Sequence, residues 1–273
     1  MFSGYTPETV DFLWGIRLNN NREWFLEHKN QYVDTLYEPT KALGKELFAP
    51  FIDKPGELLK VSRIYRDARM HHPLPYKESL WICIRRDVEW WAENPCLYFE
   101  INPDGIHYGF FWYHIRPAVA ESFRQYIAAK PDEFLKMIAD VESATGQSIT
   151  AETYKRPKHT DDPALARFFA WKGMIACTRQ EEFSDAVFGP ELAVRVREYL
   201  EKLIPLYDFC NRFTVYSATP WTAARQSPLS SSTISWNLLE FISIESVKLS
   251  NHLNLCHPPS PFAFSLSQHL FGR

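Results

Sequence analysis

Cationic and aromatic side chains crowd one short stretch of the sequence, between residues 59 and 78. Arginine guanidinium groups bind phosphate or carboxylate with two parallel hydrogen bonds, and a lysine adds a point charge. This stretch is therefore a candidate site for a small anion. We predict that the ligand contacts are Arg63, Tyr65, Arg66, Arg69, Tyr76 and Lys77.

The spacing within this stretch allows two interpretations. In a strand, Arg63, Tyr65, Asp67 and Arg69 would share one face, and Arg66 would point to the other. Asp67 would then position an arginine or act as a base in an anion site. Alternatively, the arginines and Asp67 form an ion-pair network that locks the strand to neighbouring helices, with no ligand.

His28 is a second, weaker catalytic candidate. It follows Phe25 and precedes Tyr32 and Leu36 at helical spacing, so the four side chains are predicted to share one face. A lone histidine on an apolar face is more often structural. The adjacent pair His71 and His72 has poor ligand spacing, and we expect neither a metal site nor a cofactor.

Composition limits the classes of function. The chain has 273 residues, 45% of them hydrophobic, and a net charge of −3, so nucleic acid is not the expected partner. Five scattered cysteines without a C-x-x-C motif indicate reduced thiols. The sequence lacks a signal peptide pattern and an apolar run long enough to span a membrane, so a cytoplasmic protein is expected. The oligomeric state is open.

Helix signals dominate both ends of the first 213 residues. Proline at a first helical position predicts helix starts at Pro7, Pro117, Pro131, Pro163 and Pro190. Asn21 is predicted to be an N-cap, and Gly146 and Gly173 are predicted to follow helix ends. Pro205 is predicted to bend the last helix.

Strand signals lie between these helices. Alternating apolar residues predict strands over residues 80–85, 97–101 and 107–115, and a further strand over 174–178. The sequence Asn102-Pro103-Asp104-Gly105 favours a type I turn and predicts a hairpin. Aromatic residues in these strands could stack bases or sugars, but core packing is the favoured reading. The expected fold is α+β, a mostly antiparallel sheet packed by N-terminal and C-terminal helices.

The last sixty residues differ from the rest. From Thr214 onward charge is sparse and serine abundant, and no clean period appears. Three segments, 217–226, 243–247 and 250–253, resemble translated mammalian interspersed-repeat DNA. We therefore expect one domain over residues 1–213 and an unrelated, disordered tail over 214–273. The hypothesis is a chimeric C-terminus, which sequencing a transcript across the junction would test.

Four segments carry a family resemblance. They are residues 20–32, the stretch 59–78 described above, Tyr98–Ile101 with Tyr108-Gly109, and Tyr154–Pro157. In this order they resemble the family catalogued as domain of unknown function 2461, over residues 3–213. The resemblance implies a fold and an extent, but no activity.

The leading hypothesis is that the domain binds a small anionic ligand in a pocket whose floor is the sheet. A further step of this hypothesis is that the domain also processes the ligand. Tyr65 and Tyr76 would orient the ligand. One alternative is a non-enzymatic module that contacts nucleic acid or an acidic protein. Another is a purely structural role for the Arg/Asp segment. Whether the protein is an enzyme is left open.

Overall fold

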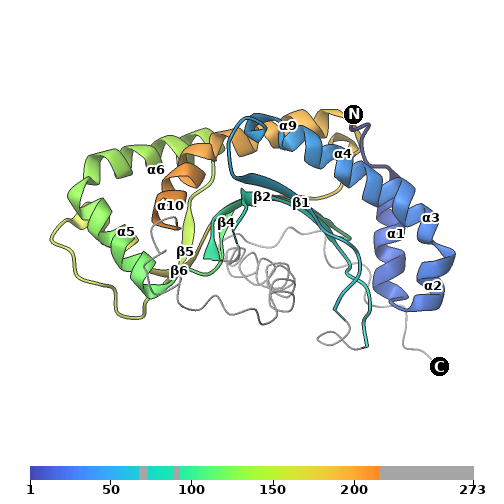
Figure 1. Cartoon of the computed structure of the whole chain (residues 1–273), viewed down its shortest axis with the longest axis horizontal. Helices are drawn as coiled ribbons and strands as arrows, with labels where there is room; N and C mark the ends of the chain where they lie inside the picture. Colours follow the sequence, from blue (N-terminus) through green and yellow to red (C-terminus); the bar gives the residue numbers. More distant parts are fainter. Residues whose placement is uncertain (68–72, 89–92, 215–273) are drawn as a thin grey trace, which may run out of the picture. The chain divides into compact units, whose positions relative to one another are not determined.

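An antiparallel sheet forms the centre of the fold (Figure 1). The computed structural model of the chain describes residues 1–67, 73–88 and 93–214. Within them, six strands follow one another in the order β1-β2-β3-β4-β6-β5, and every neighbouring pair is antiparallel. The strands are β1 Glu57–Val61, β2 Leu80–Arg86, β3 Cys96–Asn102, β4 Gly105–Trp112, β5 Thr150–Thr153 and β6 Trp171–Glu181.

Helices precede and follow the strands, which confirms the α+β prediction. The N-terminal group is α1 Pro7–Leu18, α2 Arg22–Glu27, α3 Lys29–Gln31, the π-helix η1 Tyr32–Tyr37, α4 Glu38–Leu47 and the short 3₁₀ helix η2 Ala49–Phe51. The later helices are α5 Pro117–Ala129, α6 Pro131–Thr145, the 3₁₀ helix η4 Pro163–Leu165, α7 Ala166–Phe169, α8 Asp185–Phe188, α9 Glu191–Lys202 and α10 Ile204–Thr214.

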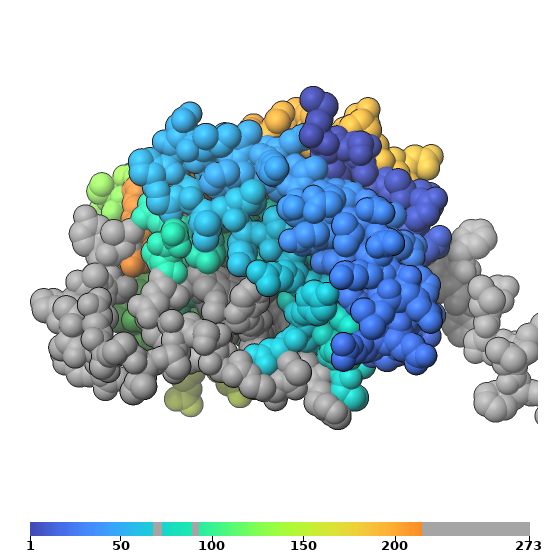
Figure 2. Space-filling view, turned by 45° about the vertical axis from the view of Figure 1, so that its right-hand side comes forward, coloured from blue at the N-terminus to red at the C-terminus, as the bar shows by residue number. Residues whose placement is uncertain are grey.

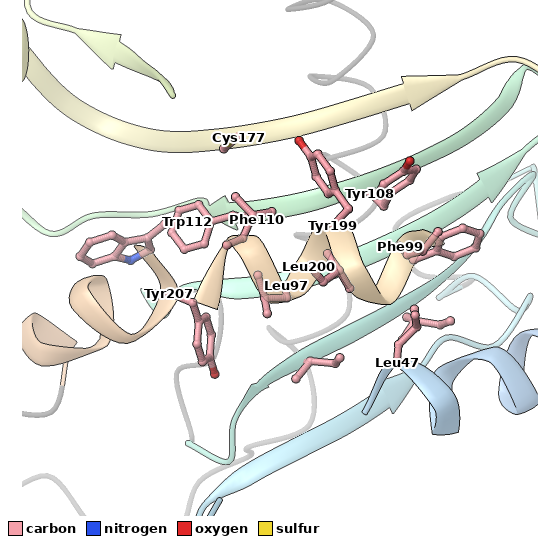
Figure 3. Close-up of a cluster of buried hydrophobic side chains, with 14 of the residues drawn as sticks. Leu47, Leu97, Phe99, Tyr108, Phe110, Trp112, Cys177, Tyr199, Leu200 and Tyr207 are labelled. Carbon is pink, nitrogen blue, oxygen red and sulfur yellow. The ribbon is translucent and has the colours of Figure 1, made fainter. Parts of the chain in front are cut away.

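One face of the sheet, here called the helix face, carries the main apolar core. Helix α4 contacts β1 and β2, α9 contacts β4, and α5 contacts β6. Figure 3 shows Leu47 of α4 and Leu200 of α9 lying against side chains of the central strands. The strand residues of this core alternate along each strand and include Leu80, Ile82, Ile84, Leu97, Phe99, Ile101, Ile106, Tyr108, Phe110, Trp112, Ile175 and Cys177.

The opposite face, here called the second face, carries the alternate residues of the same strands. It is more polar, since Glu100, His107 and Gln180 lie on it together with Trp81 and Tyr98. None of the buried apolar residues at these alternate positions belongs to the helix-packed core cluster. In Figure 1 the labelled helices α4 and α9 lie on the other side of the sheet. The core helices α4 and α9 therefore pack on the helix face and not on the second face.

The predicted hairpin is confirmed. Strands β3 and β4 are joined by two residues, with Asn102 opposite Gly105. The Asn102 side-chain oxygen accepts a hydrogen bond of 2.8 Å from the backbone N–H of Asp104. An Asn side chain that holds the backbone two residues ahead is a favoured turn device, so the local sequence sets the register of this pair.

Most predicted helix ends are also confirmed. The Asn21 side chain accepts a hydrogen bond of 3.0 Å from the backbone N–H of Trp24, as an N-cap does. Gly146 closes α6 in the left-handed conformation, at φ 67°. The last helical stretch is divided into α9 and α10 just before Pro205, because proline has no N–H to continue the ladder.

The predicted helix end at Gly173 is wrong. Helix α7 ends at Phe169, and Lys172 and Gly173 lie in β6, which begins at Trp171. This long strand pairs with both β4 and β5. In the part of β6 that contains Gly173, pairing with β5 outweighs the local preference of glycine for a helix end. No local pattern reveals this pairing.

The four described cysteines, Cys83, Cys96, Cys177 and Cys210, are free and buried, in agreement with reduced thiols. Residues 215–273 lie outside the described residues. The predicted domain boundary after Phe213 and the proposed origin of the tail therefore stay predictions.

Candidate functional site

Two extended stretches of the Arg/Lys segment lie side by side. The backbone N–H of Lys77 donates to Ile64 O at 2.7 Å, and that of Arg66 donates to Pro75 O at 2.9 Å. Between these bonds Tyr65 and Tyr76 form an isolated antiparallel bridge. Strand β1 itself ends at Val61, and the ladder follows it in the chain. The possibility of a strand from Arg63 to Arg69 extends into residues 68–72, which lie outside the described residues.

Tyr76 holds the ladder against the N-terminal helices. Its ring is 5% exposed and stacks on Phe25 of α2 at a centroid distance of 4.3 Å. The Asn20 side chain accepts from the Tyr76 N–H at 3.0 Å and donates to the Tyr76 carbonyl at 2.9 Å. Burial raises the pKa of the Tyr76 hydroxyl. These contacts are those of a structural anchor, and a ligand contact by Tyr76 stays a prediction.

Tyr65 is the more accessible of the two tyrosines. It is 52% exposed, and its ring lies 5.7 Å from that of Tyr76 and 5.7 Å from that of Phe25. Figure 2 shows the cyan residues on either side of the grey segment 68–72 beside the blue N-terminal part of the chain. Arg17 of α1 adds a salt bridge of 2.8 Å to Glu78. Helices α1 and α2 thus position the whole ladder.

The predicted cations of this segment differ in their exposure to water. Arg63 is exposed, whereas Arg66 and Asp67 are half-buried. Arg69 lies outside the described residues, as do His71 and His72. Lys77 is 5% exposed.

Lys77 is the cation that reaches the sheet. Its ammonium donates to Arg63 O at 3.0 Å and lies 6.0 Å from the centre of the Trp81 ring. The ladder therefore directs one lysine toward the start of β2, where Trp81 occupies the second face.

His28 lies at the junction between α2 and α3. Its Nδ1 lies 2.8 Å from Trp24 O, and its ring stacks on Trp24 at 4.0 Å. Phe25, Tyr32 and Leu36 are buried, whereas His28 is half-buried. The helix is interrupted at His28 and continues through α3 and the π-helix η1. The backbone N–H of Tyr32 still donates to His28 O at 3.0 Å.

A row of residues crosses the second face next to Lys77. Trp81 of β2 pairs with Glu100 of β3, Glu100 with His107 of β4, and His107 with Gln180 of β6. Directly opposite residues of antiparallel strands lie on the same face, with Cβ atoms about 4.5–5.5 Å apart. We call these four residues the Trp81–Gln180 row. Sequence reasoning did not select them, although the polar phase of the alternation in β3 and β4 was visible.

Three members of the Trp81–Gln180 row are shielded from water, whereas Gln180 is exposed. Trp81, Glu100 and His107 are 8%, 4% and 7% exposed. The indole Nε1 of Trp81 is buried and has no hydrogen-bond acceptor among the described residues. Buried N–H donors nearly always have a partner, so an unused donor beside the Lys77 ammonium is an unusual feature of this face.

Burial shifts the pKa values of His107 in the row and of Tyr98 on the same face. Burial lowers the pKa of His107 from its ordinary 6.5, with Asp104 of the hairpin turn opposing the shift. A neutral imidazole is therefore favoured near neutral pH. Burial also raises the pKa of Tyr98 well above its ordinary value, and the charge of Glu100 adds to that effect.

The shift of His107 predicts acid sensitivity. With a folded pKa below 6.5, the unfolded chain binds more protons, so the free energy of unfolding falls as the pH drops through about 6.5. Replacing His107 by Gln should make the stability less dependent on pH in that range. Urea unfolding between about pH 7.5 and pH 5 measures this. The exposed His114, changed to Gln, is the control, and equal pH profiles for all three proteins would contradict the prediction.

Other kinds of site have little support in the described part of the chain. Residues 1–67, 73–88 and 93–214 contain no group of three or more His, Cys, Asp or Glu side chains that could hold a metal ion. Within the same ranges, none of the helices has the length and apolar character required to cross a membrane.

Comparison with known proteins identifies a family without a known activity. No curated protein matches the sequence. The model of one family matches residues 8–209, which is most of the chain and covers both the Arg/Lys ladder and the Trp81–Gln180 row. The chain belongs to the family described as conserved hypothetical protein (DUF2461).

Proposed function

We propose that this domain binds a small anionic ligand on the second face of its sheet, with Lys77 and Trp81 as the principal contacts. The observation that carries the proposal is the unused Nε1–H of Trp81, buried beside the ammonium of Lys77. An anionic oxygen is the natural acceptor for such a donor and is attracted by the adjacent cation.

The surroundings favour this position. Shielding from water strengthens the hydrogen bonds and ion pairs that an anionic ligand would form with Lys77 and Trp81. Binding sites for small molecules combine apolar and aromatic walls with a few polar groups, which matches Trp81 and Tyr98 beside Glu100 and His107. Since α4, α5 and α9 pack on the helix face, core packing by these helices does not explain the second face.

The proposal gives the residues predicted from the sequence different roles in ligand binding. Lys77 becomes the anchor of the ligand, whereas Tyr76 serves to position the ladder. Arg63, Tyr65 and Arg66 flank the anchor on the same ladder, and Arg69 follows them in the chain. We place them as secondary contacts, with Asp67 as a residue that positions an arginine.

The test is a thermal-unfolding and calorimetry series on the full chain with phosphate, sulfate, acetate and a short oligonucleotide. A ligand at about a hundred times its Kd adds about 2.7 kcal/mol of stability. Lys77→Met should weaken binding of the preferred anion about ten- to a hundredfold, as expected for lost bonds to a charged group worth about 1.5–3 kcal/mol. Trp81→Phe, which keeps an aromatic ring but removes the N–H, should weaken binding about tenfold.

The control is Lys136→Met, because Lys136 is an exposed lysine on α6 that pairs with Asp140 at 2.6 Å. It should bind like the unchanged protein. Binding that falls equally in both lysine variants would refute the site. Oligonucleotide binding with a steep salt dependence would instead favour the interaction module, and no stabilisation by any compound would favour the structural role.

A further inference from the structure

We propose that the ligand is a small polyol that carries a single anionic group, as sugar phosphates and sugar acids do. This inference rests on the proposed function. The anionic group would lie at Lys77 and Trp81, and the hydroxyl groups would be bound by Glu100 and His107. The observation that points to it is the in-register order of Trp81, Glu100 and His107 on three neighbouring strands.

The spacing of the row selects a small ligand. Neighbouring strands lie about 4.8 Å apart, so the backbone positions of Trp81 and His107 are separated by about 10 Å. A monosaccharide phosphate has about this length. With its anionic end at Trp81, such a ligand would bring successive hydroxyl groups to Glu100 and then to His107, with Gln180 one strand further.

The chemistry of the row selects hydroxyl groups. A hydroxyl both donates and accepts a hydrogen bond. An ionised Glu100 only accepts hydrogen bonds. A neutral imidazole at His107 donates one hydrogen bond and accepts one, and the amide of Gln180 can also donate and accept. Lowering of the His107 pKa by burial supports the neutral form. The row therefore suits a ligand whose groups both donate and accept hydrogen bonds, as hydroxyl groups do.

The single acid in the row argues against a second anionic group. Glu100 lies directly opposite Trp81, so its carboxylate repels negative charge along the row. The Lys77 ammonium offsets this repulsion for the anionic group at Trp81. Repulsion of the wrong partner contributes to specificity as much as attraction of the right one. Oligonucleotides and nucleoside polyphosphates carry repeated negative charges, so a polyol with one anionic group fits the row better.

The test compares four probes by calorimetry on the full chain: glucose phosphate, gluconate, glucose and inorganic phosphate. We expect glucose phosphate or gluconate to bind about tenfold more tightly than inorganic phosphate, through the added hydrogen bonds. Glu100→Gln and His107→Gln should each reduce that ratio about fivefold, the effect of one altered hydrogen bond. Lys77→Met should weaken phosphate and polyol anions alike.

Matched controls are Glu152→Gln and His114→Gln, which change an exposed acid and an exposed histidine and should leave the ratio unchanged. Because Glu100 and His107 are buried, the variants could fail to fold. The histidine NMR signals of the unchanged protein then provide the test, since the His107 signals should move with a polyol anion and not with phosphate. A preference for glucose phosphate or for gluconate supports the proposal and identifies the anionic group.

The two proposals fail in different ways. Equal binding of glucose phosphate and inorganic phosphate, both dependent on Lys77, would overturn the polyol inference and leave the anion site intact. Tighter binding of glucose than of glucose phosphate, gluconate and inorganic phosphate would overturn the anion site. No binding by any probe, with the unchanged chain folded, would overturn both.

Discussion

Gly109→Ala is expected to destabilise the domain by about 4 kcal/mol or more, a large share of the roughly 5–15 kcal/mol by which native domains are stable. Gly109 lies in the middle of β4 at φ 152°, a backbone conformation that is essentially restricted to glycine and costs other residues about 1–3 kcal/mol. An added Cβ would lie 2.3 Å from Cys177 O and 2.8 Å from the Cα of Thr178. Both contacts are with backbone atoms of β6, so the β4–β6 pairing must open to admit the methyl group.

The matched control is Gly146→Ala. Gly146 also has a positive φ, 67°, but an added Cβ would meet no atom within 4 Å. Its replacement tests the backbone conformation alone and should cost about 1–2 kcal/mol. Chemical denaturation of the two variants separates backbone strain from steric overlap. Equal destabilisation would show that the close approach of β4 and β6 is not the reason for glycine at position 109.

Trp112→Ala should destabilise the domain by about 3–5 kcal/mol, the range for truncation of a large buried aromatic side chain. Trp112 is 0% exposed and belongs to the core between the sheet and the helices. Figure 3 shows its indole beside Phe110 and near the helix that carries Tyr207. Its Nε1 also donates a hydrogen bond of 2.8 Å to Glu93 O, so truncation removes a hydrogen bond as well as apolar contact.

Trp14→Ala is the control for residue type. Trp14 is 42% exposed on α1, where Arg17 lies 5.0 Å from its ring centre. An exposed cation–π contact is worth about 0.5–1 kcal/mol, so this variant should lose little more than that. Urea unfolding, followed by circular dichroism, measures both free energies. A Trp112 variant as stable as the Trp14 variant would be inconsistent with the packing described for the helix face.

Local sequence patterns predicted those features whose cause is local. The side chain of Asn21 caps a helix three residues away, and Gly146 ends one through its own conformation. The predicted helix end at Gly173 was wrong because the position of this residue has a cause that is not local. Its place in β6 depends on pairing with β5, a separate segment of the chain, and pairing energies of this kind are absent from any short window.

The Arg/Lys stretch shows how little of its arrangement is local. Its two halves pair through Tyr65 and Tyr76, and their binding of an anion stays a prediction. Which side chains point toward the N-terminal helices and which toward the sheet could not be predicted. Tyr76 meets Phe25, and Lys77 meets Trp81, because packing of the ladder against α2 decides the direction of each side chain.

The sequence by itself determined the α+β architecture and the register of one strand pair. The two-residue loop after Asn102 requires Glu100 to lie opposite His107, because loop length sets the register of a hairpin. The tertiary structure alone decided that Trp81 and Gln180 extend this pair into a row, and that Lys77 lies at its end. Strands β2 and β6 reach β3 and β4 through longer connections, which leave the register to be chosen by the packing of the whole sheet.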